Sequence, residues 1–267
     1  MPQIDYWHVD AFAARAFEGN QAAVMIFDSF PEDGVMQRIA EENNFAETAF
    51  VVPFAGEEAD YHLRWFTPAT EVRLCGHATL AAGHVILGRD GIDAVRFNTM
   101  RAGTLHVRRR GEDYELALPA IVTSPGEWPA AVAALDPSNR AAPKAIARNP
   151  DGYDIFLFDN EEIVRSLFPD MRALAALGDH QFICTAPGSQ TDVVSRVFVP
   201  GSGVDEDAVT GSAHAALTPF WAQRLGRAEF TAFQASRRGG RLSCRLEGNT
   251  VWLGGPCVTI VTGRFCY

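Results

Sequence analysis

The sequence lacks the features that define several large classes of protein. None of its apolar runs approaches the roughly 20 residues that a membrane-spanning helix needs. Its first residues, MPQIDYWHVDAF, contain no basic stretch followed by an apolar one, which disfavours a secretory signal. Its five cysteines form no C-x-x-C pair and are odd in number, so neither a zinc site nor a disulfide framework is expected. A reducing cytoplasm is the simplest setting for such a chain.

Positive charge is also scarce. The chain has 23 Lys and Arg against 33 Asp and Glu, a net charge of −10. Because affinity for phosphate comes mainly from Lys and Arg, this balance disfavours nonspecific binding to nucleic acid or to an anionic membrane. Hydrophobic residues make up 47% of the 267 residues, enough for a proper core. The length allows one large domain or two of about 130 residues.

The pattern of apolar residues predicts strands mixed with a few helices. Period-two alternation and turn residues predict strands at 6–12, 22–27, 47–52, 61–67, 94–99, 104–110, 114–119, 153–158, 182–187, 192–200, 241–247, 250–254 and 257–265. Helical spacing predicts helices at 32–44, from the Cys-Gly-His at 75–77 to near residue 87, at 160–168, at 170–177 and at 212–225. A Pro- and Ala-rich stretch at 120–144 is expected to hold a boundary and one short helix. A polar loop is expected at 201–211.

The starts of two Ala-rich helices resemble each other. CGHAT (75–79) and TGSAH (210–214) both place Gly, a polar residue and Ala at the first turn, and their glycines are 211 − 76 = 135 residues apart, about half the chain. This spacing points to a duplication in which each half wraps several strands around one central helix.

Each helix start could be either a ligand site or an ordinary turn. Free N–H groups and the positive end of the dipole favour a carboxylate there, and Gly76 and Gly211 would let it approach the backbone. The plainer reading makes Gly76 a turn glycine and Ser212 an N-cap. His77 is expected to be neutral, because the dipole disfavours the imidazolium, and able to exchange a proton. Cys75 is expected either to have a lowered thiol pKa or to be a small buried hydrophobe.

Two acidic residues are further candidates. Glu47 begins the otherwise apolar segment ETAFVV, where its carboxylate could be desolvated as a general acid–base requires, or could face solvent. Asp207 lies in DEDAVTGS before the second helix and could point into a cleft, or simply favour the helix dipole. Taken one at a time, none of these residues is compelling.

Four motifs in order, together with a closing segment, resemble one known family. They are VDAFAARAFEGNQAAV (9–24), ENNFAETAFV (42–51), FTPATEVRLCGHATLAAGHVIL (66–87), GVDEDAVTGSAHAALTPFW (203–221) and RRGGRLSCRLEGNTVWLGGPCVTIVTG (237–263). The chain resembles the phenazine-biosynthesis PhzF-like isomerases, which share the diaminopimelate epimerase fold. The resemblance spans nearly the whole chain.

The resemblance implies an α+β fold of two similar domains, each a curled, mostly antiparallel sheet around a central helix. We expect the domains at 1–118 and 119–267, with the last strand able to cross back to the first domain, and the active site in a cleft between them. The resemblance also implies a homodimer, with neither nucleic acid nor membrane as partner.

The resemblance also assigns site residues. The matching catalytic positions are Glu47 as acid–base, His77, Asp207 and Ser212. Substrate-binding positions by the same resemblance are Asn20, Cys75, Gly76, Thr210 and Gly211. No metal, nucleotide or other cofactor is expected. The implied reaction is proton relocation on a small carboxylate-bearing metabolite.

The sequence departs from related epimerases, which use one cysteine at each helix start. Cys75 stands in the first of these places, but Thr210 stands in the second, and a threonine hydroxyl is too weak an acid to serve as the second base. Three alternatives remain open. They are an amino-acid epimerase or racemase with Cys75 as one base and Glu47 or His77 as the other, a non-catalytic binding protein, and a hydrolase with Cys75 as nucleophile.

Overall fold

A computed structural model describes residues 2–267, which divide into two compact units. Unit 1 contains the residues up to Leu118 together with Trp252–Tyr267, and unit 2 contains Pro119–Val251. The division into domains at 1–118 and 119–267, expected from the sequence, stays a prediction. By contacts, however, the last 16 residues group with unit 1 rather than with the second half of the chain. The fold is α+β, with mostly antiparallel strand pairs and few helices in each unit.

Unit 1 is built from strands around α2. Its elements are β1 Gln3–Ala11, β2 Asn20–Ile26, α1 Asp33–Asn43, β3 Glu47–Pro53, β4 Tyr61–Phe66, β5 Glu71–Val72, α2 Gly76–Asp90, β6 Ala94–Thr99, β7 Thr104–Arg110, β8 Asp113–Pro119 and β18 Cys257–Cys266. Nearly every residue of α2 up to Leu87 is buried, which identifies it as the central helix. The strands pair antiparallel except for β2 with β3 and β4 with β6, which are parallel.

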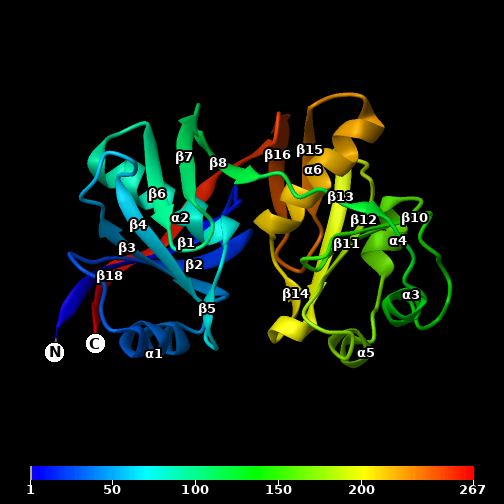
Figure 1. Ribbon diagram of the computed structural model, residues 1–267, viewed down its shortest axis with the longest axis horizontal. Coiled ribbons are helices and arrows are strands. Elements are labelled where there is room, and N and C mark those ends of the chain that lie inside the picture. The colour runs from blue at the N-terminus through cyan, green and yellow to red at the C-terminus, as the bar shows by residue number, and fades with distance from the viewer. Residues whose placement is uncertain (1) are drawn as a thin grey trace. The chain divides into compact units, whose positions relative to one another are not determined.

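The ends of the chain meet in unit 1. β18 runs antiparallel to β1, from Gln3 opposite Cys266 to Ala11 opposite Cys257 (Figure 1). The N–H of Tyr267 donates to the carbonyl of Pro2 at 3.2 Å. Long antiparallel pairing of this kind fixes a strand that is remote in the sequence.

Helix α1 forms where its apolar spacing predicts it. Met36, Ile39 and Ala40 are buried on one face and pack against apolar side chains of unit 1 that include Phe50. Asn44 ends the helix in the left-handed region, with φ of 50°, and its N–H donates to the carbonyl of Ala40.

Unit 2 follows the same plan around α6. Its elements are β9 Ser124–Pro125, α3 Pro129–Leu135, β10 Ala145–Arg148, β11 Tyr153–Leu157, α4 Glu161–Ser166, α5 Met171–Ala175, β12 Gln181–Pro187, β13 Val193–Val199, a 3-10 turn at Pro200–Ser202, β14 Val204–Asp207, α6 Gly211–Leu225, β15 Glu229–Gln234, β16 Gly240–Glu247 and β17 Thr250–Gly255, which runs past the division. The parallel pairs are β11 with β12 and β13 with β15. The small helices α3, α4 and α5 contribute to an apolar cluster that includes Phe156 and Phe182.

Helix α6 continues through an internal proline. Pro219 has no N–H to donate to the carbonyl of Ala215, four residues earlier. The N–H of Ile121 donates to that carbonyl instead, at 3.1 Å. The helix therefore keeps its length without leaving a buried acceptor unpaired.

Several elements differ from the sequence-based expectation. The expected loop at 201–211 contains the short strand β14, and β5, β9, β10 and β15 were not anticipated. Strands of two to four residues are too short to show alternation, which explains all of these except β15. The segment EFTAFQ of β15 does alternate, with Phe230, Ala232 and Gln234 buried, so that signal was present and missed.

None of the helices formed by residues 2–267 has the length and apolar character that crossing a membrane requires. The cysteines are free thiols, and Cys75, Cys184 and Cys244 are buried. The cytoplasmic setting stays a prediction.

Candidate active site

Unit 1 brings five of the expected site residues together at the start of α2. Glu47 is the first residue of β3, and one of its carboxylate oxygens, Oε2, lies 3.0 Å from Nε2 of His77. His77 is the second residue of α2, after Gly76, and Cys75 is the N-cap. Asn20, the first residue of β2, lies on the other side of the imidazole, with its amide nitrogen 3.1 Å from Nδ1.

A glycine places Asn20 at this point. Gly19 has φ of +67°, and a Cβ there would lie 2.2 Å from the carbonyl oxygen of Ala11. Only glycine can occupy such a position without strain. The chain therefore turns closely enough for Asn20 to pair opposite Ala11 and to present its amide to His77.

His77 is more basic than its place in the first helical turn predicts. The side chain is buried, which alone would lower its pKa, but Cys75 and Glu47 beside it raise the pKa well above the ordinary value. Since the Cys75 thiol is itself uncharged near neutral pH, the nearby carboxylate is the charge that favours the imidazolium. The expectation of a neutral histidine, based on the helix dipole alone, is therefore wrong.

Cys75 is a poor candidate for a thiolate base. Burial, and after it the charge of Glu47, raise the pKa of its thiol to about 11. Its Sγ lies 3.6 Å from Nδ1 of His77. The expectation that the helix start lowers this pKa is wrong, because desolvation and a like charge outweigh the dipole.

One oxygen of Glu47 is held without a hydrogen bond. Oε2 is buried and accepts none from the described residues, although His77 Nε2 lies only 3.0 Å away. The ring nitrogen is thus in ion-pair contact but not aligned as a donor. A desolvated carboxylate oxygen with a free lone pair is suited to accept a proton from a bound molecule.

The same three side chains could also hold a cation. One ligand atom each from Glu47, Cys75 and His77 lies within 4.8 Å of the other two. Carboxylate, thiolate and imidazole are ligands that zinc accepts, and three protein ligands with an open position are typical of catalytic zinc sites. Binding would require the thiol to lose its proton, so it would compete with the proton chemistry of the same residues.

Unit 2 brings the other four expected residues together at the start of α6. Thr210 is the N-cap, and Gly211 and Ser212 are the first two residues of the helix. Ser212 is therefore not the N-cap that the plainer sequence interpretation made it. The hydroxyl of Thr210 donates to Oδ2 of Asp207 at 2.6 Å, so these two side chains hold each other in place.

Two glutamines that the sequence interpretation missed support this arrangement. Gln234 is fully buried at the end of β15, where its amide oxygen accepts from the N–H of Thr210 at 2.8 Å and its amide nitrogen donates to the carbonyl of Asp207 at 2.8 Å. Gln181, the first residue of β12, donates from Nε2 to Oγ of Ser212 at 3.0 Å. Gln181 is the first residue of an apolar strand, as Glu47 is. This likeness was the sequence feature that could have identified Gln181 as a site residue.

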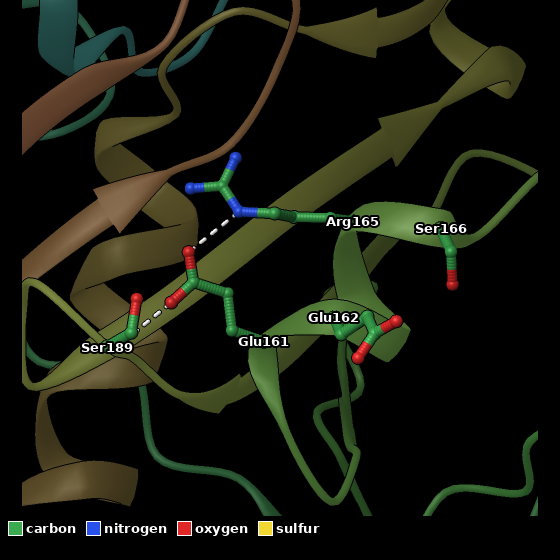
Figure 2. A pocket seen from close by; sticks show the side chains of 5 residues that line it. All are labelled: Glu161, Glu162, Arg165, Ser166 and Ser189. Carbon is green, nitrogen blue, oxygen red and sulfur yellow. Dashed lines mark hydrogen bonds and ion pairs between the residues drawn. The ribbon is translucent and has the colours of Figure 1, made fainter.

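A surface hollow elsewhere in unit 2 contains none of the expected site residues. Within it, Glu161 accepts from Nε of Arg165 at 2.6 Å and from the N–H of Ser189 at 2.7 Å (Figure 2). Glu162 and Ser166 complete its lining. Because the hollow contains none of the expected site residues, the helix starts remain the candidate site.

Comparison with known proteins identifies the family. A family model described as phenazine biosynthesis-like protein (PhzC-PhzF) matches residues 9–263. The chain is 44% identical over 266 residues to an uncharacterized isomerase of Pseudomonas aeruginosa, covering 98% of each protein. A crystal structure of a phenazine biosynthesis protein of the PhzF family from Enterococcus faecalis has a TM-score of 0.91 and 37% identity, with 100% of each chain covered.

A more distant structure shows how widely the fold is shared. A hydroxyproline epimerase from Agrobacterium vitis has a TM-score of 0.65 at 11% identity, covering 98% of this chain and 92% of that one, a likeness of fold alone. Together with the family match, it confirms the epimerase-like α+β fold expected from the sequence. The chain belongs to the phenazine biosynthesis-like PhzC-PhzF family and is an enzyme of the isomerase class.

Proposed function

We propose that the protein is a cofactor-independent isomerase that relocates a proton on a small carboxylate-bearing metabolite, with Glu47 as the acid–base. The observation that carries this proposal is the buried Oε2 of Glu47, which accepts no well-aligned hydrogen bond from residues 2–267 and lies 3.0 Å from Nε2 of His77. In the proposed first step, this oxygen takes a proton from an activated carbon. The C–H bond breaks, its electron pair moves into the substrate, and the protonated carboxyl then returns the proton to another carbon.

His77 would keep Glu47 ready for both steps. Its Nε2 lies 3.0 Å from the carboxylate oxygen that accepts the proton, and it can hold that oxygen in place. Asn20 can serve either protonation state of Nδ1, because turning its amide by 180° exchanges the donor for the acceptor.

The helix starts would hold the substrate. N–H groups in the first turns, beside Gly76 and Gly211, suit a carboxylate or the negative charge that develops on it. We propose that Ser212 donates a hydrogen bond to the substrate and that Asp207 orients it, with Cys75 and Thr210 as contacts. Exclusion of water from the bound substrate would strengthen each of these interactions.

The rival mechanism, epimerisation with Cys75 as one base, is less well supported. A thiol whose pKa is raised to about 11 is almost entirely protonated near neutral pH. It could donate a proton but would rarely accept one.

Deuterium incorporation followed by NMR tests the proposal. The protein is incubated in D₂O with a panel of small carboxylates, including amino acids and dihydroaromatic acids. We expect one compound to exchange or rearrange, and Glu47→Gln to slow that reaction by roughly 10²–10⁴-fold, the usual contribution of a general acid–base. Glu41→Gln, a change of an exposed acid on α1 of the same unit, is the matched control and should leave the rate unchanged. Exchange that survives Glu47→Gln would refute the assigned role.

The assembly is a separate proposal. We propose a homodimer on the basis of the family resemblance. Sedimentation equilibrium at micromolar concentration would show about twice the 29.1 kDa mass of one chain, and a single-chain mass would refute it.

A further inference from the structure

The two units repeat the same order of strand pairings. In unit 1, β2 is parallel to β3, β3 antiparallel to β4, and β4 parallel to β6. In unit 2, β11 is parallel to β12, β12 antiparallel to β13, and β13 parallel to β15. In each unit the central helix lies between the last two strands of this series in the sequence. This common order makes β3 the counterpart of β12, and α2 the counterpart of α6.

The central helices match residue by residue. Each has 15 residues and begins with glycine, and each ends at a glycine in the left-handed region, Gly91 with φ of 67° and Gly226 with φ of 66°. The two terminal glycines are 226 − 91 = 135 residues apart, the same spacing as Gly76 and Gly211 at the starts. Ser212 is therefore the counterpart of His77, each being the second residue of its helix.

The strands that face these residues match in the same way. In unit 1 the parallel pairing begins with Ala22 opposite Glu47, and in unit 2 with Tyr153 opposite Gln181. Glu47 and Gln181 are both the first residues of their strands, and each side chain contacts the second residue of the central helix at 3.0 Å. The pair Gln181–Ser212 thus occupies in unit 2 the place that Glu47–His77 occupies in unit 1.

The chemistry of the two pairs differs. A glutamate and a histidine both carry groups that gain and lose protons, whereas a glutamine and a serine do not. The amide nitrogen of Gln181 donates to Oγ of Ser212 at 3.0 Å, while the reverse contact, from Oγ to the amide oxygen, is longer at 3.4 Å. A hydroxyl has one donor and two acceptor sites, so accepting from the amide leaves its own proton free to be donated elsewhere.

We propose that Gln181 is a positioning residue that directs the hydroxyl proton of Ser212 toward the substrate. This inference rests on the proposed function. It assigns the proton transfer to residues at only one of the two helix starts. The Glu47–His77 pair supplies the groups that exchange a proton, whereas the Gln181–Ser212 pair supplies a hydrogen-bond donor whose charge does not change with pH. A glutamate at position 181 would accept the Ser212 proton and turn that donor away from the substrate.

The first test needs no substrate. In ¹H–¹⁵N spectra, the side-chain amide signals of Gln181 are assigned by their loss in Gln181→Ala. We expect them to shift in Ser212→Ala, while the signals of Gln234, which contacts Thr210 and Asp207 instead, stay in place. Gln181 signals that do not move in Ser212→Ala would overturn the proposal.

The second test uses the compound that shows Glu47-dependent deuterium exchange. We expect Gln181→Glu to lower kcat/KM about tenfold at pH 8, the usual effect of losing one hydrogen bond. The ratio of its kcat/KM to that of wild type should rise toward one as the pH falls, because a protonated carboxyl can again donate to Ser212. Taking the ratio cancels every pH dependence that the two proteins share.

Gln181→Ala separates positioning from a merely structural role. It should lower kcat/KM by a similar factor at every pH, because it restores no donor. If Gln181→Glu shows the same flat ratio as Gln181→Ala, the proposal is overturned. If no compound shows Glu47-dependent exchange, the proposed function fails, and the amide spectra still decide the role of Gln181.

Discussion

Individual side chains in this protein are governed by neighbours that are remote in the sequence. His77 and Cys75 lie in one helical turn, where the dipole alone predicts a neutral imidazole and an acidic thiol. Burial, together with Glu47, raises the pKa of the Cys75 thiol, and Glu47, which stands 30 residues before His77, helps to raise the pKa of the imidazole, so both expectations are reversed. The identity of these residues could be predicted as important, but not their protonation.

The first prediction concerns Cys75. We expect Cys75→Ser to retain most of the Glu47-dependent exchange activity, because a thiol with a pKa of about 11 is not the base. The assay is the NMR exchange experiment at pH 7.5. Alkylation by iodoacetamide, read by mass spectrometry, supplies the control, since buried Cys75 should react far more slowly than exposed Cys266. A loss of activity as large as that of Glu47→Gln would favour the epimerase mechanism.

The second prediction concerns His214, which is buried in the first turn of α6. Burial lowers its pKa to about 4, while Nδ1 donates to the carbonyl of Thr210 at 2.8 Å. Between the ordinary value of 6.5 and about 4, the unfolded chain binds a proton here that the folded chain does not. The free energy of unfolding therefore falls as the pH is lowered through this range.

The size of this effect follows from linkage. The slope from His214 should approach about 1.4 kcal/mol per pH unit below pH 6. Urea unfolding at pH 7, 6 and 5 measures it, and His214→Gln should show a shallower slope than wild type over the same range. Equal slopes in the two proteins would contradict the lowered pKa.

At the scale of whole elements, local patterns predicted most of the architecture. The long elements β1, β3, β7 and α6 lie within a few residues of their expected positions, because period-two and helical spacing persist over many residues. The very short strands β5 and β9 form only because longer neighbours present a free edge, which no local pattern encodes. Helix α2 runs to Asp90, three residues beyond the expected end near Leu87, and Gly91 terminates it.

Two glycines of α2 supply the third prediction. A Cβ at Gly83 would lie 2.4 Å from Cγ1 of Val107 on β7, whereas a Cβ at Gly88 would meet nothing within 4 Å. We expect Gly83→Ala to lower the free energy of unfolding by about 1–3 kcal/mol through overpacking. Gly88→Ala should raise it by up to about 1 kcal/mol through helix propensity. Urea denaturation of both variants checks the pair, and a stabilising Gly83→Ala would show that α2 does not pack this closely on β7.

At the scale of the whole molecule, each unit has the same arrangement of strands around a central helix. The last strand, β18, pairs with β1 of unit 1. The sequence indicated the duplication through the 135-residue spacing of two short motifs. The repeated order of parallel and antiparallel pairs in each unit extends that likeness to the complete sheet arrangement.

The fourth prediction tests the pairing of β18 with β1. Removing residues 257–267 takes away β18, one of the two antiparallel partners of β1, and removes the contact of Tyr267 with Phe27. We expect unit 1 to lose its native packing, seen as loss of hydrogen-exchange protection in β1 and β2. Removing only 264–267 keeps the pairs from Tyr6 opposite Gly263 to Ala11 opposite Cys257, so it should weaken but not abolish this protection.

The sequence by itself determined the family, the α+β class and the two central helices, because these depend on motifs and on periodicity within single segments. Its motifs also predicted nine site positions. Only the tertiary structure decided that Glu47 sits against His77 with an unbonded oxygen, that Gln181 takes the matching place against Ser212, and that β18 belongs with β1. Each of these is a contact between segments at least 30 residues apart. Such contacts depend on how strands pair and on what burial does to charge, and neither is encoded in any one stretch of the chain.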